Sequence, residues 1–188
     1  MLKAELVGLT AIEREDLRQL MDWRNDPRLR RYFREYREIN IPMQEAWFEQ
    51  KALSDPMTIM FAIRRLDDNE LLGSCGLVRI NWISRHAEIS LYIGWDGAYV
   101  DNEGYAEESS NLLLDYGFSE LNLNKIWIEV YAFDKKKKIL FSKLGFNVDG
   151  VLRQNYFYKG KFWDSCIMSM LSSEWRKKKY KNENSSHD

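Results

Sequence analysis

The sequence predicts a mixed α/β fold in one domain, and three observations support that prediction. A chain of 188 residues is long enough for one hydrophobic core and short for two. Apolar residues make up 45% of it, charged residues 30% and aromatic residues 14%, which is the balance of a globular protein with a substantial core. Apolar positions recur with the helical period in some segments and alternate in others. We therefore expect one mixed sheet of about seven strands with helices on both faces.

The first half of the chain predicts one strand, two helices and a three-stranded meander. Leu17, Leu20 and Met21 fall at helical spacing, and Pro27 ends their helix because the residue before a proline avoids the helical conformation. Pro42 suits the first turn of a second helix. The expected elements are a strand at 4–9, a helix at 13–23, a helix that begins at 42, and strands at 58–64, 71–80 and 86–93.

The second half predicts a loop, two helices that flank a strand, and a closing hairpin. Three glycines between Gly94 and Gly104 indicate the loop, and Gly145 is typical of a helix end. The expected elements are a helix at 105–121, a strand at 125–130, a helix at 134–144 and a hairpin of strands 146–158 and 162–171. We expect the domain to span 1–175. The segment 176–188 is polar, lacks aliphatic residues and is expected to be a flexible tail.

Composition and charge exclude several classes of protein. Twenty-eight Lys and Arg against 29 Asp and Glu leave a net charge of −1, so no global basic field attracts nucleic acid. The basic run 176–181 is either a solvated tail or a contact for RNA or an acidic partner. The chain lacks an apolar run long enough for a membrane helix and begins without the pattern of a secretory signal, so we expect a cytoplasmic protein. Cys75 and Cys166 form no disulfide framework, and no motif predicts a metal site.

A series of short strings covers nearly the whole chain. The strings are Trp23-Arg24-Asn25-Asp26, Leu72-Gly73-Ser74-Cys75-Gly76-Leu77, Ala87-Glu88-Ile89, Gly104-Tyr105-Ala106-Glu107-Glu108, Leu121-Asn122-Leu123-Asn124-Lys125-Ile126, Lys143-Leu144-Gly145-Phe146, Gly150-Val151-Leu152-Arg153, and Gly160-Lys161-Phe162-Trp163-Asp164 followed by Glu174-Trp175. In this order they resemble the GNAT superfamily of acyl-CoA-dependent N-acetyltransferases, in the branch of ribosomal-protein, spermidine, amino-sugar and antibiotic acetyltransferases. The resemblance implies the GNAT fold with two splayed central strands. It also implies acetyl transfer from acetyl-CoA to the primary amine of a small molecule or a protein N-terminus.

The resemblance also implies where acetyl-CoA binds. Its pantetheine arm is expected between strands 88–93 and 125–130, and its pyrophosphate at the loop that enters helix 105–121, where backbone N–H groups and the helix dipole favour an anion. The backbone groups expected to pair with pantetheine belong to Tyr92, Ile93 and Gly94. The remaining expected cofactor contacts are Asn102, Gly104, Tyr105, Ala106, Asp134, Lys137 and Phe141.

Glu88 is the candidate catalytic base, acting on the amine directly or through water. The alternative is an ion pair of Glu88 with Arg79 or Arg85, and His86 is a second candidate base or an edge histidine without a role. The residues expected along one wall of the acceptor cleft are Trp23, Arg24, Asn25 and Tyr32.

The sequence departs from the family pattern at both ends of the cofactor. Asp101 and Glu103 stand where the family has basic residues, and Phe141 stands where it has a tyrosine that protonates the thiolate; Ser142, Tyr131 or water are the substitutes. The lysines at 135–138 either form a solvated face or attract the cofactor phosphates. The alternative function is therefore a catalytically impaired module that binds CoA. A homodimer is also expected from the resemblance.

Overall fold

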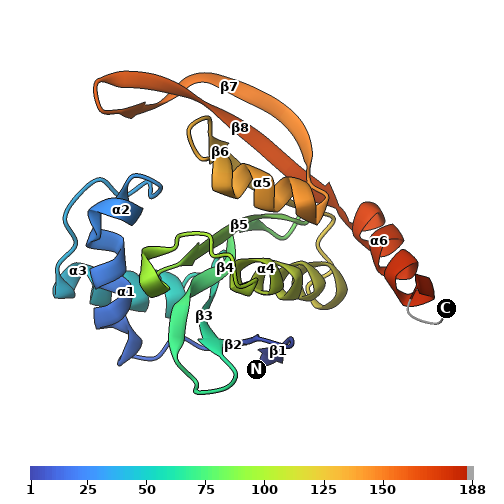
Figure 1. Ribbon diagram of the computed structural model, residues 1–188, viewed down its shortest axis with the longest axis horizontal. Coiled ribbons are helices and arrows are strands. Elements are labelled where there is room, and N and C mark those ends of the chain that lie inside the picture. Colours follow the sequence, from blue (N-terminus) through green and yellow to red (C-terminus); the bar gives the residue numbers. More distant parts are fainter. Residues whose placement is uncertain (186–188) are drawn as a thin grey trace.

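Within residues 1–185, which the computed structural model describes, eight strands form one mixed sheet in the order β1-β2-β3-β4-β5-β6-β8-β7 (Figure 1). The strands are β1 (Leu2–Lys3), β2 (Val7–Thr10), β3 (Ile59–Arg65), β4 (Leu71–Asn81), β5 (His86–Ile93), β6 (Lys125–Tyr131), β7 (Asn147–Tyr158) and β8 (Lys161–Leu171). Neighbouring strands are antiparallel except β5 and β6, which run parallel. The sheet confirms the expected fold class, and the strand expected at 4–9 is instead a short hairpin of β1 and β2.

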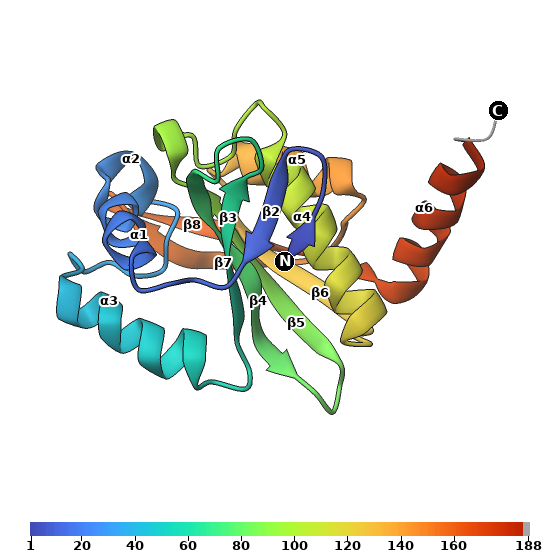
Figure 2. The same cartoon turned by 90° about the horizontal axis from the view of Figure 1, so that it is seen from below.

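The helices cover both faces of the sheet. They are α1 (Asp16–Asn25), α2 (Pro27–Arg30), α3 (Ile41–Trp47), α4 (Tyr105–Asp115), α5 (Lys135–Leu144) and α6 (Ser172–Ser185). Single π-helical turns extend α3 through Leu53 and α4 through Glu120, so the helices expected there are continuous in outline. Figure 2 shows α1, α2 and α3 on one side of the sheet and α4 and α5 on the other. Side chains such as Leu20 of α1 and Leu113 of α4 are fully buried, which closes the core on both faces.

The two central strands separate soon after they meet. β5 and β6 pair only at His86–Lys125, Ala87–Ile126 and Glu88–Trp127. Beyond Glu88 the second half of β5 has no β6 partner in the described chain. This divergence confirms the expected splayed strands, and it leaves room for a ligand at the point where Glu88 ends the pairing.

The end of the chain is helical where the sequence predicts a flexible tail. The segment expected as a tail at 176–188 is helical up to Ser185 in α6, and residues 186–188 lie outside the described part of the chain. Trp175 is buried and its ring lies 6.3 Å from that of Phe118, measured between centroids. The Lys178 ammonium donates to the Leu144 carbonyl over 3.0 Å. The helix is therefore held by one aromatic anchor, which a reading of the polar residues alone overlooks.

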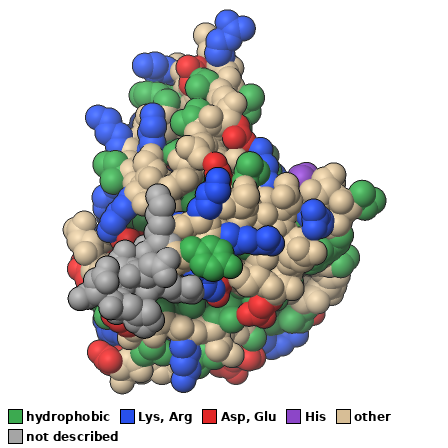
Figure 3. Space-filling model, turned by 90° about the vertical axis from the view of Figure 1, so that its right-hand side faces the viewer, with side chains coloured by type: hydrophobic (Ala, Val, Ile, Leu, Met, Phe, Trp, Pro, Cys, Tyr) green, Lys and Arg blue, Asp and Glu red, His purple; other side chains and the backbone are tan. Residues whose placement is uncertain are grey.

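The surface beside α6 carries charges of both signs. Lys and Arg side chains are spread over this face with Asp and Glu among them (Figure 3). No helix in the described part of the chain is long and apolar enough to cross a membrane.

Candidate active site

A pocket opens where β5 and β6 separate. Its walls come from Glu88–Tyr92 of β5, from the second half of β6, from α1 and α3, from the segment between α2 and α3, and from the first turn of α5. Six of the residues predicted from the sequence line it. They are Arg24, Tyr32, Glu88, Tyr92, Asp134 and Lys137. The fold thus brings the predicted base, part of the predicted acceptor wall and part of the predicted cofactor set to one place.

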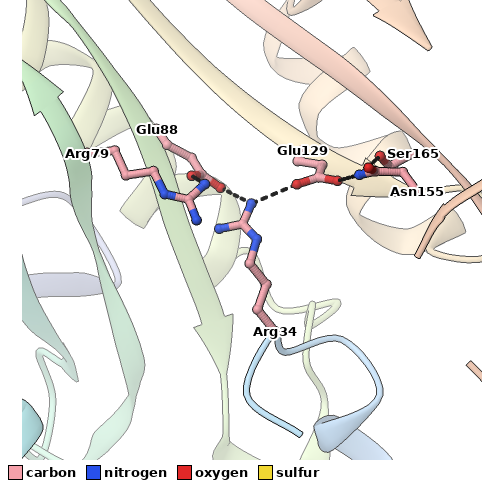
Figure 4. Close-up of polar contacts among 6 residues, drawn as sticks. All are labelled: Arg34, Arg79, Glu88, Glu129, Asn155 and Ser165. Carbon is pink, nitrogen blue, oxygen red and sulfur yellow. Dashed lines mark hydrogen bonds and ion pairs between the residues drawn. The ribbon is translucent and has the colours of Figure 1, made fainter. Parts of the chain in front are cut away.

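Glu88 is the centre of a network of ion pairs (Figure 4). One nitrogen of Arg34, Nη2, donates to Glu88 over 2.5 Å and to Glu129 over 2.9 Å. Arg79 Nη1 donates to the second oxygen of Glu88 over 2.8 Å. Arg79 adopts a left-handed conformation at the bulge that shifts the β4–β5 register. The expected alternative partner Arg79 therefore does pair with Glu88, and Arg34 is a second partner.

Two carboxylates from the diverging strands thus face a common point. The Glu88 side chain is 6% exposed and the Glu129 side chain 13%, whereas the Arg34 side chain is 42% exposed. Asn155 donates to the other oxygen of Glu129 over 2.7 Å and also contacts Ser165. Burial of two carboxylates is costly without cationic partners, so this point of the pocket is built for positive charge.

The electrostatics keep Glu129 and Arg34 ionised. Burial raises the pKa of Glu129, but hydrogen bonds with Ser165, Arg34 and Asn155 outweigh it and hold that pKa below its usual value. Burial lowers the pKa of Arg34, and its hydrogen bonds and charge interactions with Glu88 and Glu129 overcome that effect and raise the pKa. At neutral pH the pocket therefore holds an ionised Glu129 against a guanidinium.

Two charged side chains at the start of α5, Asp134 and Lys137, also line the pocket. Asp134 caps this helix by accepting the Lys137 N–H over 3.0 Å, and its other oxygen accepts the Tyr99 hydroxyl over 2.6 Å. The Lys137 ammonium lies 4.9 Å from the centroid of the Tyr99 ring. Burial lowers the pKa of Lys137 to about 8, against the opposing charges of Asp134 and Glu88. Asp134 thus uses both oxygens inside the protein.

The backbone groups expected to meet pantetheine are partly engaged. Ile93 exchanges two hydrogen bonds with Tyr99, of 3.0 and 2.8 Å, and the Gly94 N–H donates to the Leu72 carbonyl over 2.8 Å. The expectation that Ile93 and Gly94 offer open groups is therefore corrected. Because peptide groups alternate along a strand, Leu91 turns its N–H and C=O in the same direction as Ile93 and has no β6 partner in the described chain.

The loop between Gly94 and Gly104 contains a carboxylate, Asp101, at the predicted phosphate site. Asp101 accepts the N–H groups of Gly104, Tyr105 and Ala106 at 2.7, 2.8 and 2.7 Å. These are the first amides of α4, where the sequence predicts the pyrophosphate. Gly104 has φ +102°, a conformation that favours glycine, and open space where a Cβ would be. The acidic residue that departs from the family pattern thus sits on the predicted phosphate donors.

A second hollow lies beside this loop. Asn102, Gly104 and Ala106 line it together with Lys136 and Lys143 of α5. The Lys136 ammonium donates to the carbonyls of Ala98 and Val100, each over 3.1 Å. Of the four consecutive lysines, Lys136 therefore anchors the loop.

Four of the predicted site residues make structural contacts within the protein. Phe141 is fully buried and packs edge-on against Phe146, with 4.9 Å between ring centroids, so the expected cofactor contact is replaced by a core contact. The Asn25 amide makes two hydrogen bonds with the Ile39 backbone, of 2.7 and 2.9 Å. The Trp23 ring covers Gly94, where a Cβ would lie 1.9 Å from it. Tyr105 also packs inward, against Trp95, with 5.9 Å between ring centroids.

Sequence reasoning missed Arg34, Glu129 and Asn155. The alternation of strand 125–130 was a signal for Glu129, because it places that side chain on the face opposite the buried isoleucines. No signal distinguishes Arg34 from the other arginines of the segment 28–37.

Comparisons with known proteins add independent information to this geometry. A model of the acetyltransferase (GNAT) domain family matches residues 7–147. The spermidine N(1)-acetyltransferase of Escherichia coli strain K12 is 30% identical over 173 residues, which cover 92% of this chain and 89% of that protein. The Vibrio cholerae enzyme of the same name is 31% identical over 168 residues, which cover 89% and 94%.

A solved structure extends the likeness to three dimensions. It is the crystal structure of spermidine N-acetyltransferase from Vibrio cholerae in complex with CoA and spermine. It aligns with a TM-score of 0.83 at 28% identity and covers 90% of this chain and 98% of that one. With the family match over most of its length, this chain belongs to the GNAT acetyltransferases and transfers an acetyl group from acetyl-CoA to an amine.

Proposed function

We propose that the acceptor is a small polycationic amine of the spermidine type, bound between Glu88 and Glu129. The observation that carries the proposal is that one guanidinium nitrogen of Arg34 contacts both carboxylates. A protonated amine has the same charge and the same need for carboxylate acceptors, so Arg34 occupies the position of an acceptor cation. The names of the similar proteins from Escherichia coli and Vibrio cholerae support the same substrate class.

Arg34 leaves this position when the acceptor binds. Its side chain is far more exposed than the two carboxylates it contacts, and it lies between α2 and α3 in a segment without regular secondary structure. Displacement of the guanidinium by a substrate ammonium therefore exchanges one ion pair for another instead of leaving buried carboxylates unpaired.

Glu88 is the proposed base of the reaction. A primary amine is protonated at neutral pH and must lose a proton before it attacks the thioester. A buried carboxylate beside the amine both binds its cationic form and accepts its proton, directly or through water. The thioester is proposed to lie between the diverging halves of β5 and β6, beside the unpaired backbone of Leu91. Attack forms the amide C–N bond and breaks the C–S bond.

The test is release of CoA thiol with a panel of acceptors, with each product identified by mass spectrometry. The panel contains spermidine, spermine, an amino sugar and a peptide with a free N-terminus. We expect turnover with the polyamines, and a fall in kcat of about 10²–10⁴-fold for Glu88→Gln. Glu120→Gln, at an exposed position of the π-helical turn after α4, is the matched control. Turnover with the peptide alone, or full activity of Glu88→Gln, would contradict the proposal.

The same assay decides the impaired-module alternative. Asp101 on the α4 amides favours weak donor binding. If the chain binds CoA in a thermal-shift titration but releases no thiol with any amine, it is a binding module.

The expected homodimer stays a prediction, which light scattering in solution measures directly.

A further inference from the structure

Acetyl transfer leaves a thiolate that requires a proton. In the proposed function, on which this inference rests, the ammonium first loses one proton through Glu88 to solvent, and the nitrogen of the neutral amine loses another proton to Glu88 as it forms the amide. The C–S bond breaks with its electron pair on sulfur, and a proton from another donor must reach that sulfur to give CoA thiol. The donor must line the pocket where β5 and β6 separate, must carry a proton near neutral pH, and must be free to give it up.

Most proton-bearing groups of the pocket are committed or too weakly acidic. The Tyr99 hydroxyl donates to Asp134, and burial followed by the Asp134 charge raises its pKa well above the ordinary value. Burial raises the pKa of Tyr131 to about 12, and burial also raises the pKa of Tyr92. The Ser74 hydroxyl donates to the Phe61 carbonyl over 3.0 Å. Arginines keep their protons at all physiological pH values.

Lys137 meets all three requirements. It lies in the first turn of α5, and its half-buried side chain lines the same pocket as Glu88 and the unpaired half of β6. Its backbone is fixed by the Asp134 cap and its ammonium is held over the Tyr99 ring. Within the described part of the chain the ammonium donates no hydrogen bond to another residue, so its protons are available to a ligand.

The charged surroundings set the acidity of this ammonium. Asp134 faces it from its own helix, Glu88 from β5 and Arg34 from the segment after α2, and Tyr99 lies beneath it. Burial is the largest influence and lowers the pKa of Lys137 to about 8. An ordinary thiol has a pKa of about 8.5, so a proton moves between the two groups at little energetic cost.

We propose that Lys137 is the catalytic acid that protonates the departing CoA thiolate. One proton of the ammonium leaves to solvent through Glu88 before attack, Glu88 receives the second when the amide forms, and Lys137 gives one to sulfur. Exchange with solvent restores Glu88 and Lys137 after product release. The residue acts on the acyl donor, so its role is the same for any amine acceptor.

Two substitutions separate proton donation from charge. Lys137→Met keeps much of the side-chain shape and removes both, whereas Lys137→Arg keeps the charge but holds its proton too tightly to donate it. We expect kcat to fall about 10²-fold in both variants. In the parent protein kcat should also decline above pH 8, as the ammonium is lost, and this decline should be absent from both variants. Lys138→Met, at the exposed neighbouring position, is the control and should match the parent.

A binding measurement tests the same residue without any acceptor. The thiolate absorbance of CoA bound to the protein gives the pKa of the bound thiol. We expect this pKa to be lower in the parent protein than in Lys137→Met, because a neighbouring ammonium stabilises the thiolate. This result is independent of the acceptor, so failure of the polyamine assay leaves it intact.

Three results would overturn the proposal. The first is an Lys137→Arg variant with nearly full kcat and an unchanged alkaline decline, which would show that only the charge matters. The second is an equal pKa of the bound thiol in the parent and in Lys137→Met. The third is an acetyl group on Lys137 itself after incubation with acetyl-CoA, found by mass spectrometry, which would make this amine an acceptor.

Discussion

The Asp101 carboxylate lies where the sequence predicts the pyrophosphate of the acyl donor. It accepts three amides at the start of α4, and these are the groups that a pyrophosphate needs at a helix N-terminus. Two anions cannot share these donors. If the pyrophosphate binds at these amides, as the sequence predicts, acetyl-CoA has to displace Asp101 from them, and the displacement subtracts from its binding free energy.

Replacement of Asp101 should separate donor binding from stability. We expect Asp101→Ala to bind acetyl-CoA more tightly, because the three N–H groups become free. We also expect the unliganded variant to lose about 0.5–2 kcal/mol of unfolding free energy with the loss of a helix cap. Calorimetric titration with acetyl-CoA and urea unfolding measure the two effects. Weaker donor binding by the variant would show that Asp101 shapes the loop for the cofactor.

Single residues of the site were predictable only where a pattern marks them. Glu88 follows from its motif and its place on a strand, and the structure puts it in the pocket with six percent of its side chain exposed. Arg34 was not predictable, because its role depends on how an irregular segment folds back over two strands. Phe141 was misassigned because the motif fixes its position in the sequence, whereas core packing against Phe146 fixes its direction.

The strands and helices were predictable in kind and nearly in extent. Alternation and helical spacing report which face of an element is buried, and that information is local. The strand expected at 86–93 has the same bounds as β5. The helix expected at 134–144 differs from α5 only at Asp134, which is the N-cap and not the first helical residue. The divergence of β5 from β6 was predicted from the family resemblance alone. The pairing of strands that are distant in the sequence leaves no local pattern.

The helix α6 was not predicted from the sequence, for a different reason. Its residues are polar and its first turns depend on Trp175, whose partner Phe118 lies far away in the sequence. Low apolar content suggests disorder, whereas this helix is held by one buried aromatic ring together with the contacts of Lys178 and Lys179.

The contact of α6 can be tested with a pair of substitutions. Trp175→Ala removes a buried ring and should cost about 3–5 kcal/mol of unfolding free energy. Lys179→Ala breaks the ion pair with Asp115, whose atoms are 2.7 Å apart on an exposed surface, and should cost about 0–1 kcal/mol. Urea unfolding followed by circular dichroism measures both. If the two variants are equally stable, α6 does not pack through Trp175.

At the scale of the whole molecule, the protein carries a cationic side chain at the proposed acceptor site and an anionic side chain at the predicted phosphate site. Each substrate would therefore replace a side chain of its own charge. Arg34 lies between the carboxylates where the proposed acceptor cation binds, and Asp101 lies on the amides predicted for the donor phosphates. The net charge of the chain is −1, so we expect recognition of both substrates to depend on these local groups and not on a global field.

The central claim is that Glu88 and Glu129 together bind the ammonium group of the acceptor. The direct measurement is kcat/KM for spermidine in the parent protein and in Glu129→Gln, with Glu120→Gln as the control. A hydrogen bond to a charged group contributes about 1.5–3 kcal/mol, so kcat/KM should fall at least tenfold in Glu129→Gln and stay unchanged in the control. A Glu129→Gln variant with the same kcat/KM for spermidine as the parent protein would contradict this claim.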